Sequence, residues 1–283
     1  MPTIALIVTG DMERVALPTS LKKVFQTADF TAQQVDCFTS ARVVWPPAQR
    51  PGMLSNIEKY VTALVAALVP GQRKGSPPDF VFGFDDLEMA NHHQPDAVIT
   101  AFRLALKAEL QRREANLNRA SYVKLEAAVR ERCSFHLLVP MCEAYFYADP
   151  GALQAAGCTR PPQIVPDRDV ELFTVTEPDY LVDLSTQPFP LPTWAIDLAL
   201  RPLHPKRYLE FLLGSYQETA QGTAGLCALD WRRVLSRPDH TRFLRSFFQD
   251  LAYALDMDLS LFPGQTHPLT SDWKNKHRLL RNF

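Results

Sequence analysis

Three short runs of apolar residues, at positions 4–8, 80–84 and 135–139, are separated by long segments whose apolar residues recur every three or four positions. A short continuous apolar run predicts a buried strand, and the three-to-four spacing predicts a helix. Strands that alternate with helices are typical of a parallel or mostly parallel sheet flanked by helices. The sequence therefore predicts an α/β fold for the first half of the chain.

Acidic residues follow each of these runs, where the chain would leave the sheet. The carboxyl ends of parallel strands line one crevice, so acids from separate strands are expected to meet there. Such oxygen-rich clusters suit Mg²⁺ or Mn²⁺. The candidate metal ligands are Asp11, Glu13, Asp85, Asp86, Glu88 and Glu143. The alternative is that these are ordinary strand-end residues, with Asp11 capping the helix that follows.

Helices are predicted at 55–69, 95–113 and 121–132, where apolar residues gather on one face. A further helix is predicted after Gly10. It contains Pro18, which a helix tolerates only in its first turn.

The character of the chain changes after residue 157. Many of its 23 prolines lie between 158 and 205, which predicts irregular structure with one strand at 171–176. Helical spacing returns from Lys206 onward. We therefore expect an α/β domain at 1–157 and an irregular, then helical, region at 158–283. Phe243, Phe247 and Phe248 of the helical part are interpreted either as core residues or as a docking surface.

The composition is that of a globular protein, with 46% hydrophobic and 22% charged residues and a net charge of −1. Five widely spaced cysteines without a Cys-x-x-Cys pair make a zinc framework improbable and favour reduced thiols. The sequence shows no signal peptide and no apolar stretch of roughly 20 residues, so a cytoplasmic location without a membrane span is expected. It also contains no P-loop, Gly-x-Gly-x-x-Gly or Gly-x-Ser-x-Gly motif.

Basic residues offer local sites for a phosphate backbone on this neutral chain. The candidates for nucleic-acid binding are Lys206, Arg207, Arg232 and Arg233. A solvated charged face is the alternative explanation. His92 and His93 are interpreted as exposed loop residues or as a metal ligand, and His136 as a core histidine.

Several motifs together resemble TOPRIM-like proteins. The segment from Thr9 to Glu13 resembles that family's opening motif, which usually reads Val-Glu-Gly, two variable residues and Glu. The segment Asp85-Asp86-Leu87-Glu88 resembles its Asp-x-Asp motif. The stretch 140–150 is similar to that of a bacterial subgroup encoded beside ABC-type or OLD-like ATPases, and 204–209 and 229–231 are similar to its C-terminal part.

The resemblance implies a Mg²⁺- or Mn²⁺-dependent nuclease, or an effector derived from one, with Glu13 and Asp86 as catalytic residues. It also implies an ABC/OLD-type ATPase partner, a DNA or tRNA substrate and a role in bacterial defence against phage. Two departures qualify this. Thr9 replaces the family Glu, and Pro140 and Met141 replace acidic-motif residues before Glu143. A catalytically inactive interaction or regulatory subunit is therefore the alternative.

Overall fold

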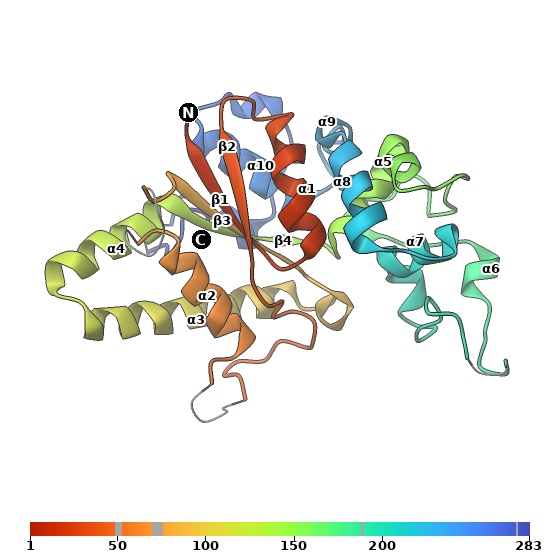
Figure 1. Cartoon of the computed structure of the whole chain (residues 1–283), viewed down its shortest axis with the longest axis horizontal. Coiled ribbons are helices and arrows are strands. Elements are labelled where there is room, and N and C mark those ends of the chain that lie inside the picture. The colour runs from red at the N-terminus through yellow and green to blue at the C-terminus, as the bar shows by residue number, and fades with distance from the viewer. Residues whose placement is uncertain (49–52, 70–75, 188–189, 276) are drawn as a thin grey trace.

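The computed structural model describes residues 1–48, 53–69, 76–187, 190–275 and 277–283, and contains one four-stranded sheet. All strand pairs are parallel and their order is β2-β1-β3-β4 (Figure 1). The strands are β1 Thr3–Val8, β2 Asp29–Gln34, β3 Phe80–Asp86 and β4 Cys133–Leu138. The predicted α/β fold with a parallel sheet flanked by helices is confirmed.

Both faces of the sheet are apolar, which is why its strands read as continuous hydrophobic runs rather than as alternating patterns. Successive side chains on a strand point to opposite faces. One face presents Leu6, Val8 and Phe84, among others, to the first hydrophobic cluster. The other face presents Ile7 and Phe135 to the second cluster.

Helices cover the two faces as separate layers. The first face is packed by α1 Asp11–Lys22 and α10 Arg242–Ala254. The second face is packed by α2 Asn56–Ala66, α3 Pro95–Asn116 and α4 Arg119–Arg132. The helices predicted at 55–69, 95–113 and 121–132 are therefore present, with ends that differ by a few residues.

Three local predictions were wrong or incomplete. Strand β2 was missed because its sequence is polar, as an edge strand permits. The strand expected at 171–176 is instead the 3-10 turn Val170–Leu172, followed by a single bridge between Ile164 and Val175. Pro18 lies inside α1 rather than in its first turn.

Apart from α10, the helices beyond residue 140 are short and are joined by irregular segments. The 3-10 helix η2 covers Cys142–Ala148 and the π-helix η5 covers Glu218–Gly222. The α-helices are α5 Pro150–Ala155, α6 Pro178–Leu181, α7 Pro205–Leu213, α8 Thr223–Ala228 and α9 Trp231–Val234. The other 3-10 turns are η1 Met89–Asn91, η3 Val170–Leu172, η4 Arg201–Leu203, η6 Leu259–Leu261 and η7 Pro268–Thr270.

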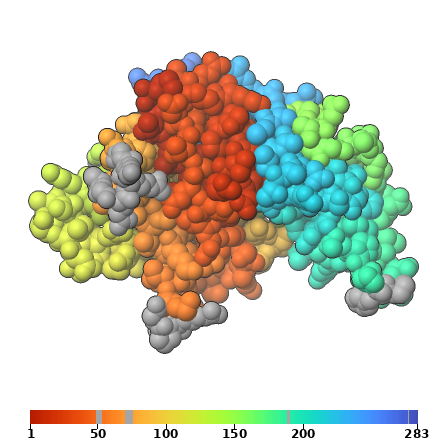
Figure 2. Space-filling model, viewed as in Figure 1, coloured from red at the N-terminus to blue at the C-terminus, as the bar shows by residue number. Residues whose placement is uncertain are grey.

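These later helices complete the core of the sheet instead of building a separate one. Phe247 of α10 lies edge-on to Phe84 of β3, with ring centroids 4.6 Å apart. Trp231 donates a hydrogen bond from Nε1 to Ser20 Oγ at 2.8 Å. Figure 2 shows the helices that follow residue 200 packed directly against the N-terminal part of the chain. Phe243, Phe247 and Phe248 are thus core residues rather than a docking surface.

The last residues of the chain cover the β4 edge of the sheet. The Arg281 amide donates to the Cys133 carbonyl at 2.8 Å, and the Asn282 side chain pairs with both backbone groups of Phe135. Within the described ranges, no helix combines the length and apolar character needed to cross a bilayer.

Candidate functional site

The first acidic residue of the site, Glu13, lies in the first turn of α1, directly after β1. Its side chain is 4% exposed and folds back over Gly10. A Cβ atom at Gly10 would stand 1.9 Å from Glu13 Oε2, so this close approach requires glycine. Glu13 Oε2 is buried and has no hydrogen-bond partner in the described part of the chain. An orphaned buried carboxylate oxygen is rare in folded proteins and is compatible with a missing ligand.

The two adjacent aspartates at the end of β3 point to different environments, as neighbouring residues on a strand must. Asp86 accepts a hydrogen bond from the Cys142 amide at 3.0 Å. Asp85 instead accepts from the Thr9 hydroxyl at 2.6 Å, from the Cys37 thiol at 3.4 Å and from the Phe38 amide at 3.3 Å. Its oxygens are therefore occupied by Thr9, directly after β1, and by the loop that follows β2.

Glu88 and Glu143 come from the chain segments that leave β3 and β4. The Glu88 backbone has a φ of 61°, in the left-handed region that non-glycine residues rarely adopt, and its amide donates to the Pro140 carbonyl at 2.9 Å. Glu143 lies in η2, is 2% exposed and accepts a hydrogen bond from the Tyr216 hydroxyl at 3.1 Å. The strained Glu88 backbone is typical of a functional position.

The C-terminal region adds a cation and a further acid. Lys206, in the first turn of α7, pairs with Glu218 of η5, and its Nζ lies 3.8 Å from Glu143 Oε1. Glu218 Oε1 also lies 3.1 Å from the place where a Gly10 Cβ would stand. We call Glu13, Asp86, Glu88, Glu143 and Glu218 the carboxylate cluster. Lys206 is the cation that pairs with two of its members.

Burial and mutual repulsion set the protonation of the carboxylate cluster. Burial, reinforced by Glu143, raises the pKa of Glu13 to about 8 and that of Glu88 to about 7. Burial and the Glu13 carboxylate raise the pKa of Asp86, and burial and Glu218 raise that of Glu143. Although burial opposes it, Glu143 and Glu218 raise the pKa of Lys206 above its ordinary value. These acids are therefore shifted towards the protonated form near neutral pH, and the ammonium of Lys206 offsets part of the remaining negative charge.

The chemical type of the donors in the cluster suits a divalent cation, but the present positions of these side chains do not form a metal site. Its carboxylates are hard oxygen donors, and Glu13 offers an unpartnered buried oxygen. Among the described residues, however, no group of three or more His, Cys, Asp or Glu side chains is arranged to hold a metal ion. The ammonium of Lys206 instead pairs with two of the acids.

The structure brings together four of the predicted ligands and separates two. Glu13, Asp86, Glu88 and Glu143 influence one another's charge. Asp11 is turned away and pairs with Arg14 at 3.0 Å on the surface. Asp85 is engaged by Thr9, Cys37 and Phe38, although its charge still acts on Asp86.

The predicted nucleic-acid-binding residues do not form one patch. Lys206 belongs to the acidic site and Arg207 pairs with Glu210 at 2.8 Å. Arg232 and Arg233 are exposed on α9, which is anchored by Trp231 to Ser20 near the far end of α1. Seven residues of helix, roughly 10 Å, separate Ser20 from Glu13.

The structure also places two of the histidines. His136 is a core residue, with Nε2 at 3.2 Å from Asp250 Oδ2 and its ring stacked on Phe82. His92 Nδ1 lies 2.7 Å from the Met89 carbonyl, beside η1.

Sequence reasoning missed Tyr216 and Glu218, and did not predict that Lys206 pairs with acids of the cluster. No local pattern links them to the strand-end acids, because Lys206 and Tyr216 contact Glu143 from 63 and 73 residues away in the sequence. Comparison of the chain with family models, curated proteins and solved structures finds no match. The chemistry of this site therefore has to be argued from its own geometry.

Proposed function

We propose that the carboxylate cluster is the site of a phosphodiester hydrolase that uses Mg²⁺ or Mn²⁺ and acts on nucleic acid, DNA or tRNA. The observation that carries this proposal is the unpartnered, buried Oε2 of Glu13 among carboxylates from three strand ends. Acids so close together cannot all be ionised at neutral pH without added positive charge. A bound cation would neutralise charge on the phosphate and activate a water molecule.

The residues of the cluster have distinct roles in this proposal. Asp86 and Glu143 are held in place by the Cys142 amide and the Tyr216 hydroxyl, which suits ligands of fixed position. Glu13, with its unpartnered buried oxygen, would add an oxygen donor for the cation. Lys206 places a positive charge where a phosphate oxygen would approach the acids.

Metal binding and cleavage test this proposal in parallel. We expect Mn²⁺ to bind the wild type in calorimetric titration, and DNA or tRNA to be cleaved with Mg²⁺ or Mn²⁺. Asp86→Asn should weaken Mn²⁺ binding and lower cleavage by orders of magnitude, and Glu13→Gln should lower cleavage. The matched control is Asp11→Asn, because Asp11 lies in a surface pair outside the cluster. Unchanged Mn²⁺ binding in Asp86→Asn would contradict the proposal.

A non-catalytic interaction subunit is the second candidate, and the ion pairs of Lys206 favour it. In this alternative the ammonium of Lys206 permanently takes the place of a cation, and the chemistry is lost. Thr9 supports the same alternative. It stands at the position where the resembling family carries Glu, and its hydroxyl donates a hydrogen bond to Asp85. The wild type would then bind no Mn²⁺, whereas Lys206→Ala would bind it.

We further propose an ABC/OLD-type ATPase as partner in bacterial defence against phage, on the resemblance of the acidic motifs alone. The test is co-expression with an ATPase encoded by a neighbouring gene, followed by size-exclusion chromatography. Cleavage by the complex but not by the isolated chain would support an effector activated by its partner. Separate elution at micromolar concentrations would contradict the partnership.

A further inference from the structure

A small pocket lies at the opposite end of the sheet from the carboxylate cluster. The Arg281 guanidinium, on its wall, lies 5.2 Å from the ring of Phe80, where β3 begins. The Arg281 amide bonds to Cys133, where β4 begins. The cavity measures about 210 Å³ and is lined by Gln249, Tyr253, Leu259, Trp273, Arg278 and Arg281.

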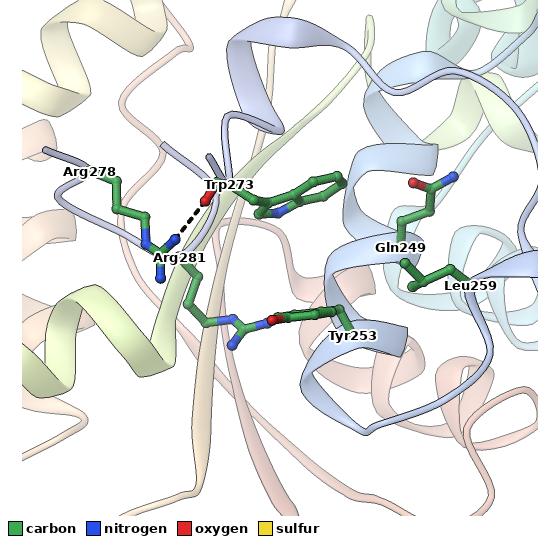
Figure 3. A pocket seen from close by; sticks show the side chains of 6 residues that line it. All are labelled: Gln249, Tyr253, Leu259, Trp273, Arg278 and Arg281. Carbon is green, nitrogen blue, oxygen red and sulfur yellow. Dashed lines mark hydrogen bonds between the residues drawn. The ribbon is translucent and has the colours of Figure 1, made fainter. Parts of the chain in front are cut away.

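Two aromatic rings project into this pocket from different segments, Trp273 from the C-terminal tail and Tyr253 from α10 (Figure 3). Tyr253 is 65% exposed, so its ring is accessible to a ligand. Leu259 and Gln249 lie beside the rings, and the Gln249 amide is fixed by bonds to the carbonyls of Phe262 and Gly264. Aromatic rings from two segments at one small pocket are suited to stacking a planar group.

Two polar atoms at the pocket lack hydrogen-bond partners among the described residues. Nε1 of Trp273 is buried without a hydrogen-bond partner within the described ranges, and so is Nε of Arg278. Both atoms have almost no accessible surface, so they lie behind the pocket wall and a ligand in the pocket would not touch them directly.

The charges of the pocket favour an anion. Arg281 is balanced by Asp250, with Nη2 and Oδ1 3.0 Å apart, and its guanidinium lies 5.5 Å from the Tyr253 ring. Arg278 donates to the Trp273 carbonyl at 2.6 Å but forms no ion pair with any described residue. A guanidinium without a carboxylate is a ready partner for a phosphate.

We infer that this pocket binds a mononucleotide, whose base lies between Trp273 and Tyr253 and whose phosphate contacts Arg278. The small volume fits one base rather than a strand. Because the pocket lies at the amino ends of β3 and β4, the bound nucleotide would be a second ligand, distinct from any substrate of the carboxylate cluster. The inference does not depend on the proposed hydrolase activity.

Titration of the full chain with AMP tests this inference, read by calorimetry and by tryptophan fluorescence. We expect saturable binding that is weakened about tenfold or more by Trp273→Ala, and clearly weakened by Arg278→Gln. Adenosine and inorganic phosphate should each bind more weakly than AMP, since each keeps one half of the contacts. The matched control is Arg168→Gln, an exposed arginine away from the pocket, which should bind AMP like the wild type.

A second variant keeps the test valid if the first one is destabilised. If Trp273→Ala melts at a lower temperature, Tyr253→Ser replaces it, because an exposed ring is removed with little effect on folding. Absence of saturable AMP binding would overturn the inference. Equal affinity for AMP and phosphate would overturn it too, and so would equal AMP affinity of wild type and both aromatic variants.

Discussion

Thr9 donates a hydrogen bond to Asp85, with Oγ1 and Oδ1 2.6 Å apart, and so joins the ends of β1 and β3. The donor, Thr9, stands at the position where the resembling family carries a catalytic acid. It also turns Asp85 towards Cys37 and Phe38 and away from the carboxylate cluster. Thr9 is thus part of the framework that holds the site.

We predict that Thr9→Val destabilises the protein, whereas Thr9→Ser does not. Valine keeps the shape but removes the donor, which leaves a buried Asp85 oxygen with one bond fewer, at a cost of about 1–2 kcal/mol. Urea unfolding at pH 7 measures the difference. Equal stability of the valine and serine variants would show that the hydroxyl contributes nothing.

A second prediction concerns the pH dependence of stability through Glu13. Its pKa is 4.5 ordinarily and about 8 in the folded chain, so the folded state binds the proton more tightly than the unfolded state. The resulting stability is fully present below pH 4.5 and is lost as the pH rises through about 8. Glu13→Gln, which cannot ionise, should remove this loss, on the order of 2 kcal/mol between pH 5.5 and 8.5.

Urea unfolding at these two pH values measures this effect. Asp11→Asn serves as the control, because Asp11 is exposed and should leave the wild-type slope unchanged. A wild type whose stability rises over the same interval would contradict the assignment. Addition of Mn²⁺ should flatten the slope if the cluster binds a divalent cation.

The third prediction tests the charge of Lys206. Replacement by Met removes the ammonium from between Glu143 and Glu218. Because the Lys206 side chain is 38% exposed, water screens part of the effect, and a loss of about 1–2 kcal/mol is expected at pH 8. The loss should be smaller at pH 5, where more of the acids are protonated.

Lys59→Met is the matched control for Lys206. Lys59 pairs with Asp36 in a surface ion pair of 3.0 Å, whose members are 45% and 62% exposed. Such pairs contribute little, so its stability should change by less than about 0.5 kcal/mol at either pH. Identical effects of the two substitutions would show that Lys206 has no special electrostatic role.

The fourth prediction concerns Glu171, which caps α10 from a distant segment. Its carboxylate accepts from the amides of Phe243 and Leu244 at 3.0 and 2.9 Å, where the helix has no side-chain cap of its own. Glu171→Ala should destabilise the protein by about 2–3 kcal/mol, since two buried amides lose their acceptor. Asp258→Ala, which removes an exposed cap, should cost no more than about 1 kcal/mol.

The sequence alone predicted three of the four strands and the position of the acids at their ends. The runs at 4–8, 80–84 and 135–139 are apolar on both faces, and only buried parallel strands satisfy such runs. Because carboxyl ends of parallel strands share one edge, Glu13, Asp86, Glu88 and Glu143 were expected near one another, and in the structure the charges of these carboxylates act on one another. The polar edge strand β2 escaped prediction, because an edge strand need not be apolar.

Only the tertiary structure decided what surrounds those acids. The direction of Asp85 depends on the loop after β2, and Lys206, Tyr216 and Glu218 reach the site from a region with no local signal. The positions of these residues follow from long-range packing of α7, η5 and α8 against α1 and η2, which spacing along the chain does not encode. The pocket between α10 and the tail arises in the same way. Tyr253 and Trp273, which line it, are 20 residues apart in the sequence and come together only when the core has formed.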